Sequence, residues 1–242
     1  MIGIIGAMEE EVAILQGLIL NRAKETIGPF EYFTGVLEGK DIVLLRCGIG
    51  KCNAAMGAAL LVNRFKPDLV INTGCAGGMN PAGCTPALNF GDVVVSSALV
   101  YHDFDISAFG YAVGQIPGMK DAFFHVEKSV IQTSLRAIGE LKSEGLLPAS
   151  LNYTECLIGS GDIFVCEAKR VEKIIKLFPN IRAVEMEGSA IAHACSLFGT
   201  RYIVIRAMSD IAGEESPVKF DEFLPAAAKH SSEIVKRIVK LY

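Results

Sequence analysis

With 242 residues and 51% hydrophobic content, the chain is long enough for one large domain whose core covers a sheet on both faces. Its formal net charge of −4 and the absence of any lysine or arginine block argue against nucleic acid as a partner. No apolar stretch reaches the roughly 20 residues that span a bilayer, and no signal-peptide pattern opens the chain, so we expect a cytoplasmic protein with no membrane partner.

Short apolar runs alternate with helical patterns along the chain. The runs are rich in β-branched residues and predict strands buried on both faces, at Ile2–Ile5, Ile42–Leu45, Leu69–Asn72, Val93–Val95 and Tyr202–Ile205. Apolar residues at three- and four-residue spacing predict helices, over Asn53–Phe65, Val126–Lys142, Ala168–Phe178, Ser189–Phe198 and Phe220–Leu241. This alternation predicts an α/β fold with a central, largely parallel sheet in one domain covering residues 1–242.

The segment richest in glycine and proline, Gly74 to Gly83, directly follows the predicted strand Leu69–Asn72. Ligands of open α/β sheets collect beyond the carboxyl ends of the strands, and glycines there let the backbone approach a small molecule closely. The alternative is a long turn. Residues 80–89, which contain two prolines, are expected to form a surface excursion without a helix or strand.

Carboxylates follow three of the predicted strands. They lie in Glu9–Glu11, in Glu185–Glu187 after the apolar run Ile181–Val184, and at Asp210. Each has a plain structural interpretation, since acidic residues compensate helix dipoles, cap helices and stabilise turns. Their convergence at one sheet edge favours a site for a small polar ligand.

The chemistry of that ligand is restricted by the first of these segments. Gly3-Ile4-Ile5-Gly6 lacks the third glycine of a dinucleotide fingerprint, and the glutamates that follow would repel a phosphate. In the second segment one glutamate can cap the helix while the other accepts hydrogen bonds from a ribose diol. Asp210 is a candidate general acid if its surroundings raise its pKa.

Cysteine and histidine do not form recognisable metal motifs. The seven cysteines lack CxxC spacing, which favours reduced, buried thiols. His102, Asp103 and Asp105 open a segment rich in aromatic residues, but no second histidine or cysteine follows at ligand spacing. We therefore expect no metal, and we interpret this apolar segment as a subunit interface.

Six motifs in chain order resemble the 5'-methylthioadenosine/S-adenosylhomocysteine nucleosidase family of the nucleoside phosphorylase superfamily. They are Gly3-Ile4-Ile5-Gly6-Ala7-Met8-Glu9-Glu10-Glu11, Gly48-Ile49-Gly50-Lys51, Asn72-Thr73-Gly74, Ser160-Gly161-Asp162, Ala183-Val184-Glu185-Met186-Glu187 and Arg206-Ala207-Met208-Ser209-Asp210. The likeness extends over nearly the whole chain, and the motifs are specific as a set. It implies a three-layer sandwich with a mixed, largely parallel sheet between helices.

The resemblance also implies a hydrolase that releases adenine from 5'-methylthioadenosine and S-adenosylhomocysteine, and also from 5'-deoxyadenosine, without a cofactor. Glu11 would activate water with help from Arg206, while Asp210, supported by Ser209, would protonate adenine N7. Glu187 would hold the ribose hydroxyls. The other implied substrate contacts are Met186, Glu185, Phe164, Val165, Ile49, Cys75, Ala76, Gly77 and Phe220, with Ile106, Phe109 and Pro117 from a partner subunit. The implied assembly is a homodimer in which residues 101–119 complete the neighbouring site.

Two other functions compete with hydrolysis. A nucleoside phosphorylase would need donors for phosphate where Glu11 places a negative charge, which favours water as the nucleophile. A non-catalytic nucleoside-binding module would have no use for both Glu11 and Asp210. The family pattern commonly has serine at position 75, and the thiol of Cys75 is a weaker donor that leaves water activation more dependent on Glu11 and Arg206. Preference among nucleosides with different 5' groups, aminofutalosine included, stays open.

Overall fold

The computed structural model describes residues 1–213 and 216–242, without the side chains of residues 214–223. Ten strands are present in the described residues: β1 (Ile2–Gly6), β2 (Leu20–Ile27), β3 (Phe30–Leu37), β4 (Lys40–Arg46), β5 (Leu69–Gly78), β6 (Val93–Tyr101), β7 (Phe123–His125), β8 (Tyr153–Ser160), β9 (Ile181–Glu185) and β10 (Arg201–Ile211). The helices are α1 (Glu9–Leu18), α2 (Lys51–Phe65), α3 (Lys128–Ser143), α4 (Ala168–Leu177), α5 (Gly188–Phe198) and α6 (Ser216–Leu241), with a short 3₁₀ helix η1 (Ser107–Phe109).

All ten strands belong to one mixed sheet, in the order β10-β6-β8-β9-β5-β1-β4-β3-β2, with β7 on β6. Strands β1, β4, β5 and β10 pair in parallel, as do β6, β8 and β9. Because β10 also pairs with β5, the strands β5, β9, β8, β6 and β10 close into a ring. Strands β1, β4, β3 and β2 extend the sheet beyond β5 as its open part.

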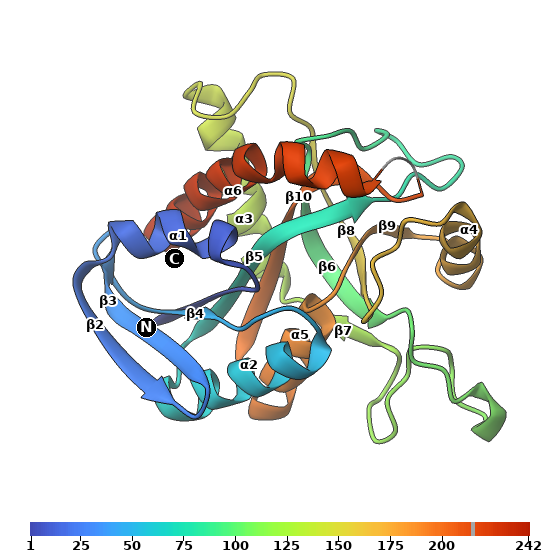
Figure 1. Cartoon of the computed structure of the whole chain (residues 1–242), viewed down its shortest axis with the longest axis horizontal. Coiled ribbons are helices and arrows are strands. Elements are labelled where there is room, and N and C mark those ends of the chain that lie inside the picture. Colours follow the sequence, from blue (N-terminus) through green and yellow to red (C-terminus); the bar gives the residue numbers. More distant parts are fainter. Residues whose placement is uncertain (214–215) are drawn as a thin grey trace.

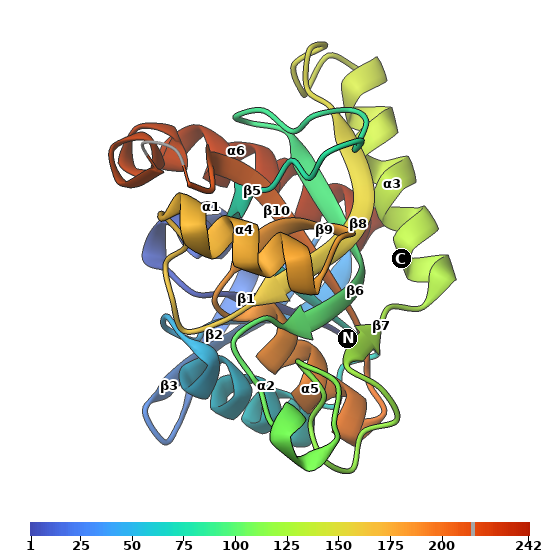
Figure 2. The ribbon, with the colours of Figure 1, turned by 90° about the vertical axis from the view of Figure 1, so that its right-hand side faces the viewer.

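Helices cover both faces of this sheet. Helices α1 and α6 lie together on one side, with α3 packed against α6, and α2 and α5 lie together on the opposite side (Figures 1 and 2). The central strands between them are buried on both faces, most completely β1 and β9. The predicted three-layer α/β fold is confirmed. No helix within the described part of the chain combines the length and the apolar character needed to cross a membrane.

Two expectations about strand ends are wrong. Gly74 to Gly78 do not form a loop, because β5 continues to Gly78, and β10 continues past Asp210 to Ile211. The two strands pair in parallel along almost their whole length, from the Leu69 pair with Arg201 onwards. Each strand supplies the hydrogen-bond partners that let the other strand continue. This pairing is tertiary, so the local glycine content does not predict it.

The hairpin β2–β3 and the strands β7 and β8 were not predicted from the sequence. Strand β2 is largely exposed, so it lacks the apolar run that marks a buried strand. Residues 80–89 form no helix or strand, as expected. Their fold is held by the Asn80 side chain, which accepts a hydrogen bond from the Leu88 N–H at 2.7 Å and donates one to the Leu88 carbonyl at 3.0 Å.

Candidate active site

A cavity of about 410 Å³ opens where β5 exchanges one neighbouring strand for another. Along one edge, β5 pairs with β1 up to Asn72 and then with β9 only at Gly77 and Gly78. The intervening backbone is free to face a side chain or a ligand instead of a strand. Such a change of partner at the carboxyl ends of parallel strands is the usual place for ligand binding in α/β proteins.

Glu11 occupies this gap from the first turn of α1. Its Oε1 accepts a hydrogen bond from the Cys75 N–H at 3.1 Å, and its Oε2 accepts from the N–H groups of Ala7 and Met8 at 2.8 and 3.0 Å. Its side chain is buried, whereas Glu9 and Glu10 are exposed. The carboxylate is therefore fixed at the floor of the cavity and fills the donors at the start of the helix.

Gly74 lies directly against this carboxylate. A Cβ atom at position 74 would be 2.4 Å from Glu11 Oε1, closer than two such atoms can pack. The glycine is therefore needed for the close approach of Glu11 to β5. Next along the strand, the Cys75 thiol lines the cavity, and burial together with the charge of Glu11 raises its pKa. It stays protonated and is a weak donor beside the carboxylate.

Asp210 lies in the part of the cavity formed by β10. It is 2% exposed, and its Oδ1 accepts a hydrogen bond from Ser209 Oγ at 2.9 Å. Gly77 makes room for it, since a Cβ atom there would be 3.2 Å from Asp210 Oδ2. Glu11 and Asp210 thus reach one cavity from α1 and from β10, which is the arrangement required for a base and an acid that act on one substrate.

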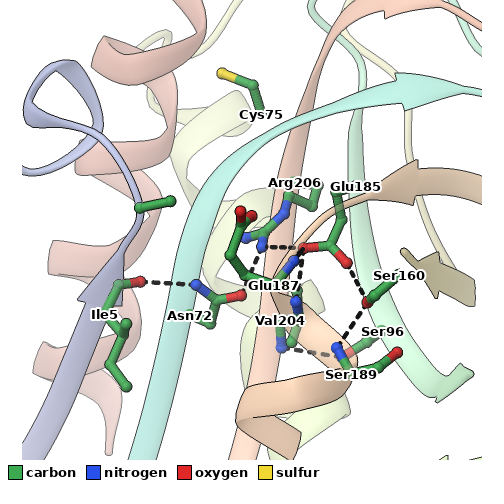
Figure 3. A network of polar contacts seen from close by, with 12 residues as sticks. Ile5, Asn72, Cys75, Ser96, Ser160, Glu185, Glu187, Ser189, Val204 and Arg206 are labelled. Carbon is green, nitrogen blue, oxygen red and sulfur yellow. Dashed lines mark hydrogen bonds and ion pairs between the residues drawn. The ribbon is translucent and has the colours of Figure 1, made fainter. Parts of the chain in front are cut away.

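Glu185 is the structural member of the second acidic segment. Its Oε2 accepts hydrogen bonds from the N–H groups of Glu187 and Gly188 at 3.0 and 2.7 Å, at the start of α5. The same oxygen accepts from Arg206 Nη2 at 2.5 Å, and Ser160 Oγ donates to the other oxygen (Figure 3). Burial opposes ionisation, but Arg206 and these hydrogen bonds hold the pKa of Glu185 below its usual value.

Arg206 is buried under the site and does not line the cavity. Its Nη2 also donates to Asn72 Oδ1 at 2.6 Å, and Nη1 donates to the carbonyl of Ile205 (Figure 3). Arg206 thus forms an ion pair with Glu185, and its expected help in holding the water site at Glu11 stays a prediction. Arg206 is not a surface charge, although an arginine at the end of a strand commonly is. Its burial is tolerated because the acidic side chains around it stabilise the charged guanidinium.

Glu187 is the other glutamate of the same acidic segment, and like Glu185 it lines the cavity. Its Oε1 accepts a hydrogen bond from the Gly50 N–H at 2.8 Å, which joins the start of α2 to the start of α5. Burial and the negative charge of Glu185 raise the pKa of Glu187 to about 7. A partner that donates hydrogen bonds to this carboxyl favours its ionised form.

The cavity brings most of the sequence-predicted site residues together. It is lined by Glu11, Ile49, Cys75, Ala76, Gly77, Phe164, Val165, Glu185, Met186, Glu187, Ser209 and Asp210. Ala7, Met8, Ile163 and Val184 also line it and were not predicted. Ile163 and Val184 are adjacent in sequence to the predicted residues Phe164 and Glu185, and Ala7 and Met8 lie shortly before Glu11 in the first glycine-rich motif. Ile49 and Phe164 are about half exposed at its rim, and Val165 is buried.

Three predicted contacts do not line this cavity in the described residues, and a fourth, the side chain of Phe220, lies outside the described residues. Ile106, Phe109 and Pro117 belong to the segment between β6 and β7 that extends away from the sheet (Figure 1), and none of them lines the cavity of their own chain. Phe109 is 81% exposed. Their expected role concerns a neighbouring subunit.

Among the described side chains, those of residues 1–213 and 224–242, no group of three histidine, cysteine or acidic residues is arranged to hold a metal ion. His102 is buried, and burial lowers its pKa, while Asp103 forms an ion pair with Lys51. All seven cysteines are free thiols.

The chain is similar to known proteins along its whole length. The family model described as the phosphorylase superfamily matches residues 1–240. The 5'-methylthioadenosine/S-adenosylhomocysteine nucleosidase of Geobacillus thermodenitrificans is 49% identical over 232 residues, which cover 96% of this chain and 93% of the relative.

Solved structures agree with this relationship. The nucleosidase of the same name from Colwellia psychrerythraea, in complex with adenine, has a TM-score of 0.91 at 40% identity and is matched over 99% of this chain and 94% of that one. The Neisseria meningitidis enzyme in complex with methylthio-immucillin-A has the same TM-score and identity, with 99% and 98% of the two chains covered.

Proposed function

Because this chain belongs to the 5'-methylthioadenosine/S-adenosylhomocysteine nucleosidase family of the phosphorylase superfamily, we propose that it hydrolyses the N-glycosidic bond of both nucleosides and releases adenine. 5'-Deoxyadenosine, which carries the same base and lacks only the alkylthio group, is included in the proposed substrate class. The observation that carries the proposal is the pair of buried carboxyl groups, Glu11 and Asp210, in one cavity.

The two carboxyl groups suit the charge that develops during bond cleavage. The sugar becomes positive and the leaving purine becomes negative, so the reaction needs a base for water on one side and an acid on the other. Glu11, held by three backbone N–H groups, takes the proton from the attacking water. Asp210, hydrogen-bonded to Ser209, delivers a proton to N7 of adenine, so the base leaves as a neutral molecule.

Water rather than phosphate is the nucleophile in this proposal. The N–H groups of Ala7, Met8 and Cys75 are the donors that an anion would use, and Glu11 already occupies them. A phosphate placed there would face a carboxylate in a largely desolvated site and lose these hydrogen bonds.

The remaining lining residues fit the rest of an adenine nucleoside. Glu187 accepts hydrogen bonds from the ribose hydroxyls beside Met186, and these donors favour its ionised form. Phe164 stacks near the base and the backbone of Val165 contacts the edge of the base. Glu185 contributes by holding Arg206 and the start of α5 in place. Cys75, Ala76 and Gly77 form the floor of the cavity beneath the substrate. Ile49 and Phe220 are expected to contact the 5' group.

A homodimer is part of the proposal. The segment between β6 and β7 extends from the sheet (Figure 1), and its Phe109 is exposed, which is unfavourable for an isolated subunit in water. In the proposed dimer, residues 101–119 place Ile106, Phe109 and Pro117 at the 5' pocket of the partner. Activity and dimer should then be lost together on dilution, measured by adenine release and by sedimentation. The cytoplasmic location expected from the sequence stays a prediction.

The substrate assignment is tested by incubating the protein separately with 5'-methylthioadenosine, S-adenosylhomocysteine, 5'-deoxyadenosine and aminofutalosine. Adenine release is followed by chromatography, with Glu11→Gln as the inactive control. Efficient cleavage of the first two nucleosides is expected. Cleavage of none of the four, or of aminofutalosine alone, contradicts the proposal.

A further inference from the structure

Three charged residues outside the cavity join segments that are far apart in the sequence. Lys51 begins α2, Asp103 follows β6 and Asp162 follows β8. Lys51 Nζ lies 2.7 and 2.6 Å from the two carboxylate oxygens of Asp103 and 3.8 Å from Asp162 Oδ2. We refer to Lys51, Asp103 and Asp162 as the charged clamp.

Backbone hydrogen bonds make the charged clamp more specific than a surface ion pair. Asp162 Oδ1 accepts from the N–H of Lys51 at 2.7 Å, and Asp103 Oδ2 accepts from the N–H of Asp162 at 2.9 Å. Each aspartate therefore binds both the ammonium group and the backbone of another segment. The side chains of Lys51 and Asp103 are only 24% and 14% exposed, which reduces the solvent screening that weakens most surface pairs.

Two of the three segments joined by the charged clamp, those of Lys51 and Asp162, continue directly into a wall of the cavity. Immediately before Lys51 are Ile49, which lines the cavity, and Gly50, whose N–H binds Glu187. Immediately after Asp162 come residues 163–165, all of which line the cavity. The charged clamp thus fixes the wall that holds Glu187 relative to the wall that carries Phe164.

Two glycines show how closely these segments pack. A Cβ atom at Gly161 would lie 2.4 Å from His102 Cε1 and 2.9 Å from Asp103 Cγ. Gly50 has a φ of +95°, and a Cβ atom there would lie 3.2 Å from Asp162 Oδ1. The backbone is therefore brought to the carboxylates at distances that no larger residue permits.

We propose that the charged clamp is a positioning device that sets the spacing of the ribose and base walls of the site. This inference rests on the proposed function for its kinetic consequences. Within the described residues, the hydrogen bonds of the charged clamp are separate from those that hold Glu11, which come from the N–H groups of Ala7, Met8 and Cys75, and from the bond that Ser209 donates to Asp210. Loosening it therefore weakens substrate binding and leaves the acid and the base in place.

The kinetic test compares Asp103→Asn with the parent protein on 5'-methylthioadenosine. We expect KM to rise about tenfold, because small displacements of positioning groups have effects of this size or larger, while kcat and its pH profile stay close to those of the parent. The matched control is Asp121→Asn, another aspartate that accepts a backbone N–H and lies 3.4 Å from a side-chain nitrogen, that of His125, on the exposed surface. An unchanged KM in Asp103→Asn, or a fall in kcat alone, overturns the inference.

A double-mutant cycle tests whether the residues act as one unit. If they do, Lys51→Met combined with Asp103→Asn raises KM no more than the larger single effect. If the effects of the two single substitutions on KM multiply in the double variant, the residues do not act as a unit and the inference is overturned.

A readout that does not need activity separates this inference from the proposed function. In Asp103→Asn, hydrogen exchange should accelerate in residues 48–51 and 161–165, with the exchange of α1 unchanged. Unchanged exchange in both segments overturns the inference, whether or not the parent protein releases adenine. If Asp103→Asn does not fold, Asp162→Asn, whose side chain is half exposed, serves for both measurements. A parent that releases no adenine contradicts only the proposed function.

Discussion

Replacing Gly74 by alanine displaces the proposed base without changing its chemistry. The new Cβ atom would lie 2.4 Å from Glu11 Oε1, whereas ordinary contacts of this kind begin at 3.4 Å. The carboxylate must therefore move by about 1 Å, and such a displacement of a reacting group costs roughly 10²-fold in rate. It also weakens the hydrogen bond from the Cys75 N–H, which is 3.1 Å long in the structure.

The assay for Gly74→Ala is kcat for adenine release, together with a thermal unfolding measurement. A folded protein with kcat reduced by about 10²-fold and a much smaller change in KM is expected. Gly17→Ala is the matched control, because nothing lies within 4 Å of a Cβ atom at that helical position. It should keep full activity and gain up to about 1 kcal/mol in stability. A folded Gly74→Ala protein with the kcat of the parent would refute the assignment of Glu11 as the base.

Three further changes have defined outcomes. Glu11→Gln and Asp210→Asn should each lower kcat by roughly 10²–10⁴-fold in stopped assays of adenine release, and turnover close to the parent in either would contradict the acid and base roles. Because the pKa of Glu187 is raised to about 7, its ionised form is lost as the pH falls, so KM should rise below that pH. Glu187→Gln should have a higher KM without this pH dependence. A parent KM that is flat between pH 5 and 8 would contradict the ribose role. Arg206→Met leaves Glu185 buried without its cation and should lower the free energy of unfolding by about 3–5 kcal/mol in denaturant titrations; a loss below about 1 kcal/mol would show that the ion pair matters little.

The sequence located the carboxyl groups because their positions follow from general rules of α/β folds. Apolar runs mark the buried strands, and polar side chains at their carboxyl ends meet at one sheet edge. The acidic segment Glu9–Glu11 could be anticipated on this basis, as could one helix-capping glutamate and one ligand-binding glutamate in the segment 185–187. The choice of Glu11 and Glu187 within these segments came from the family resemblance. These features depend on residues close together in the sequence.

The features that were missed depend on pairing between distant segments. Strands β5 and β10 extend each other beyond their apolar runs, so the glycines after Asn72 lie in a strand and form the cavity floor. The ion pair of Arg206 with Glu185 depends on the spacing of β9 and β10 around the ring, which is set by strand register. Local sequence patterns carry no information about which strands pair or about the spacing of β9 and β10.

The charged clamp was missed for the same reason. Asp103 was considered only together with its sequence neighbours His102 and Asp105, as a possible metal ligand. In the structure its partners are Lys51 and Asp162, from two other segments. A side chain's role at a sheet edge is therefore set by which loops meet there, which the sequence alone did not reveal.

The rate of adenine release with and without inorganic phosphate tests the central claim most directly. The protein is freed of phosphate, supplied with 5'-methylthioadenosine, and assayed across a phosphate titration while mass spectrometry identifies the sugar product. With Glu11 occupying the N–H groups that an anion would use, release should proceed at full rate without phosphate and yield 5-methylthioribose. A rate that depends on phosphate, with a sugar 1-phosphate as product, would contradict the account.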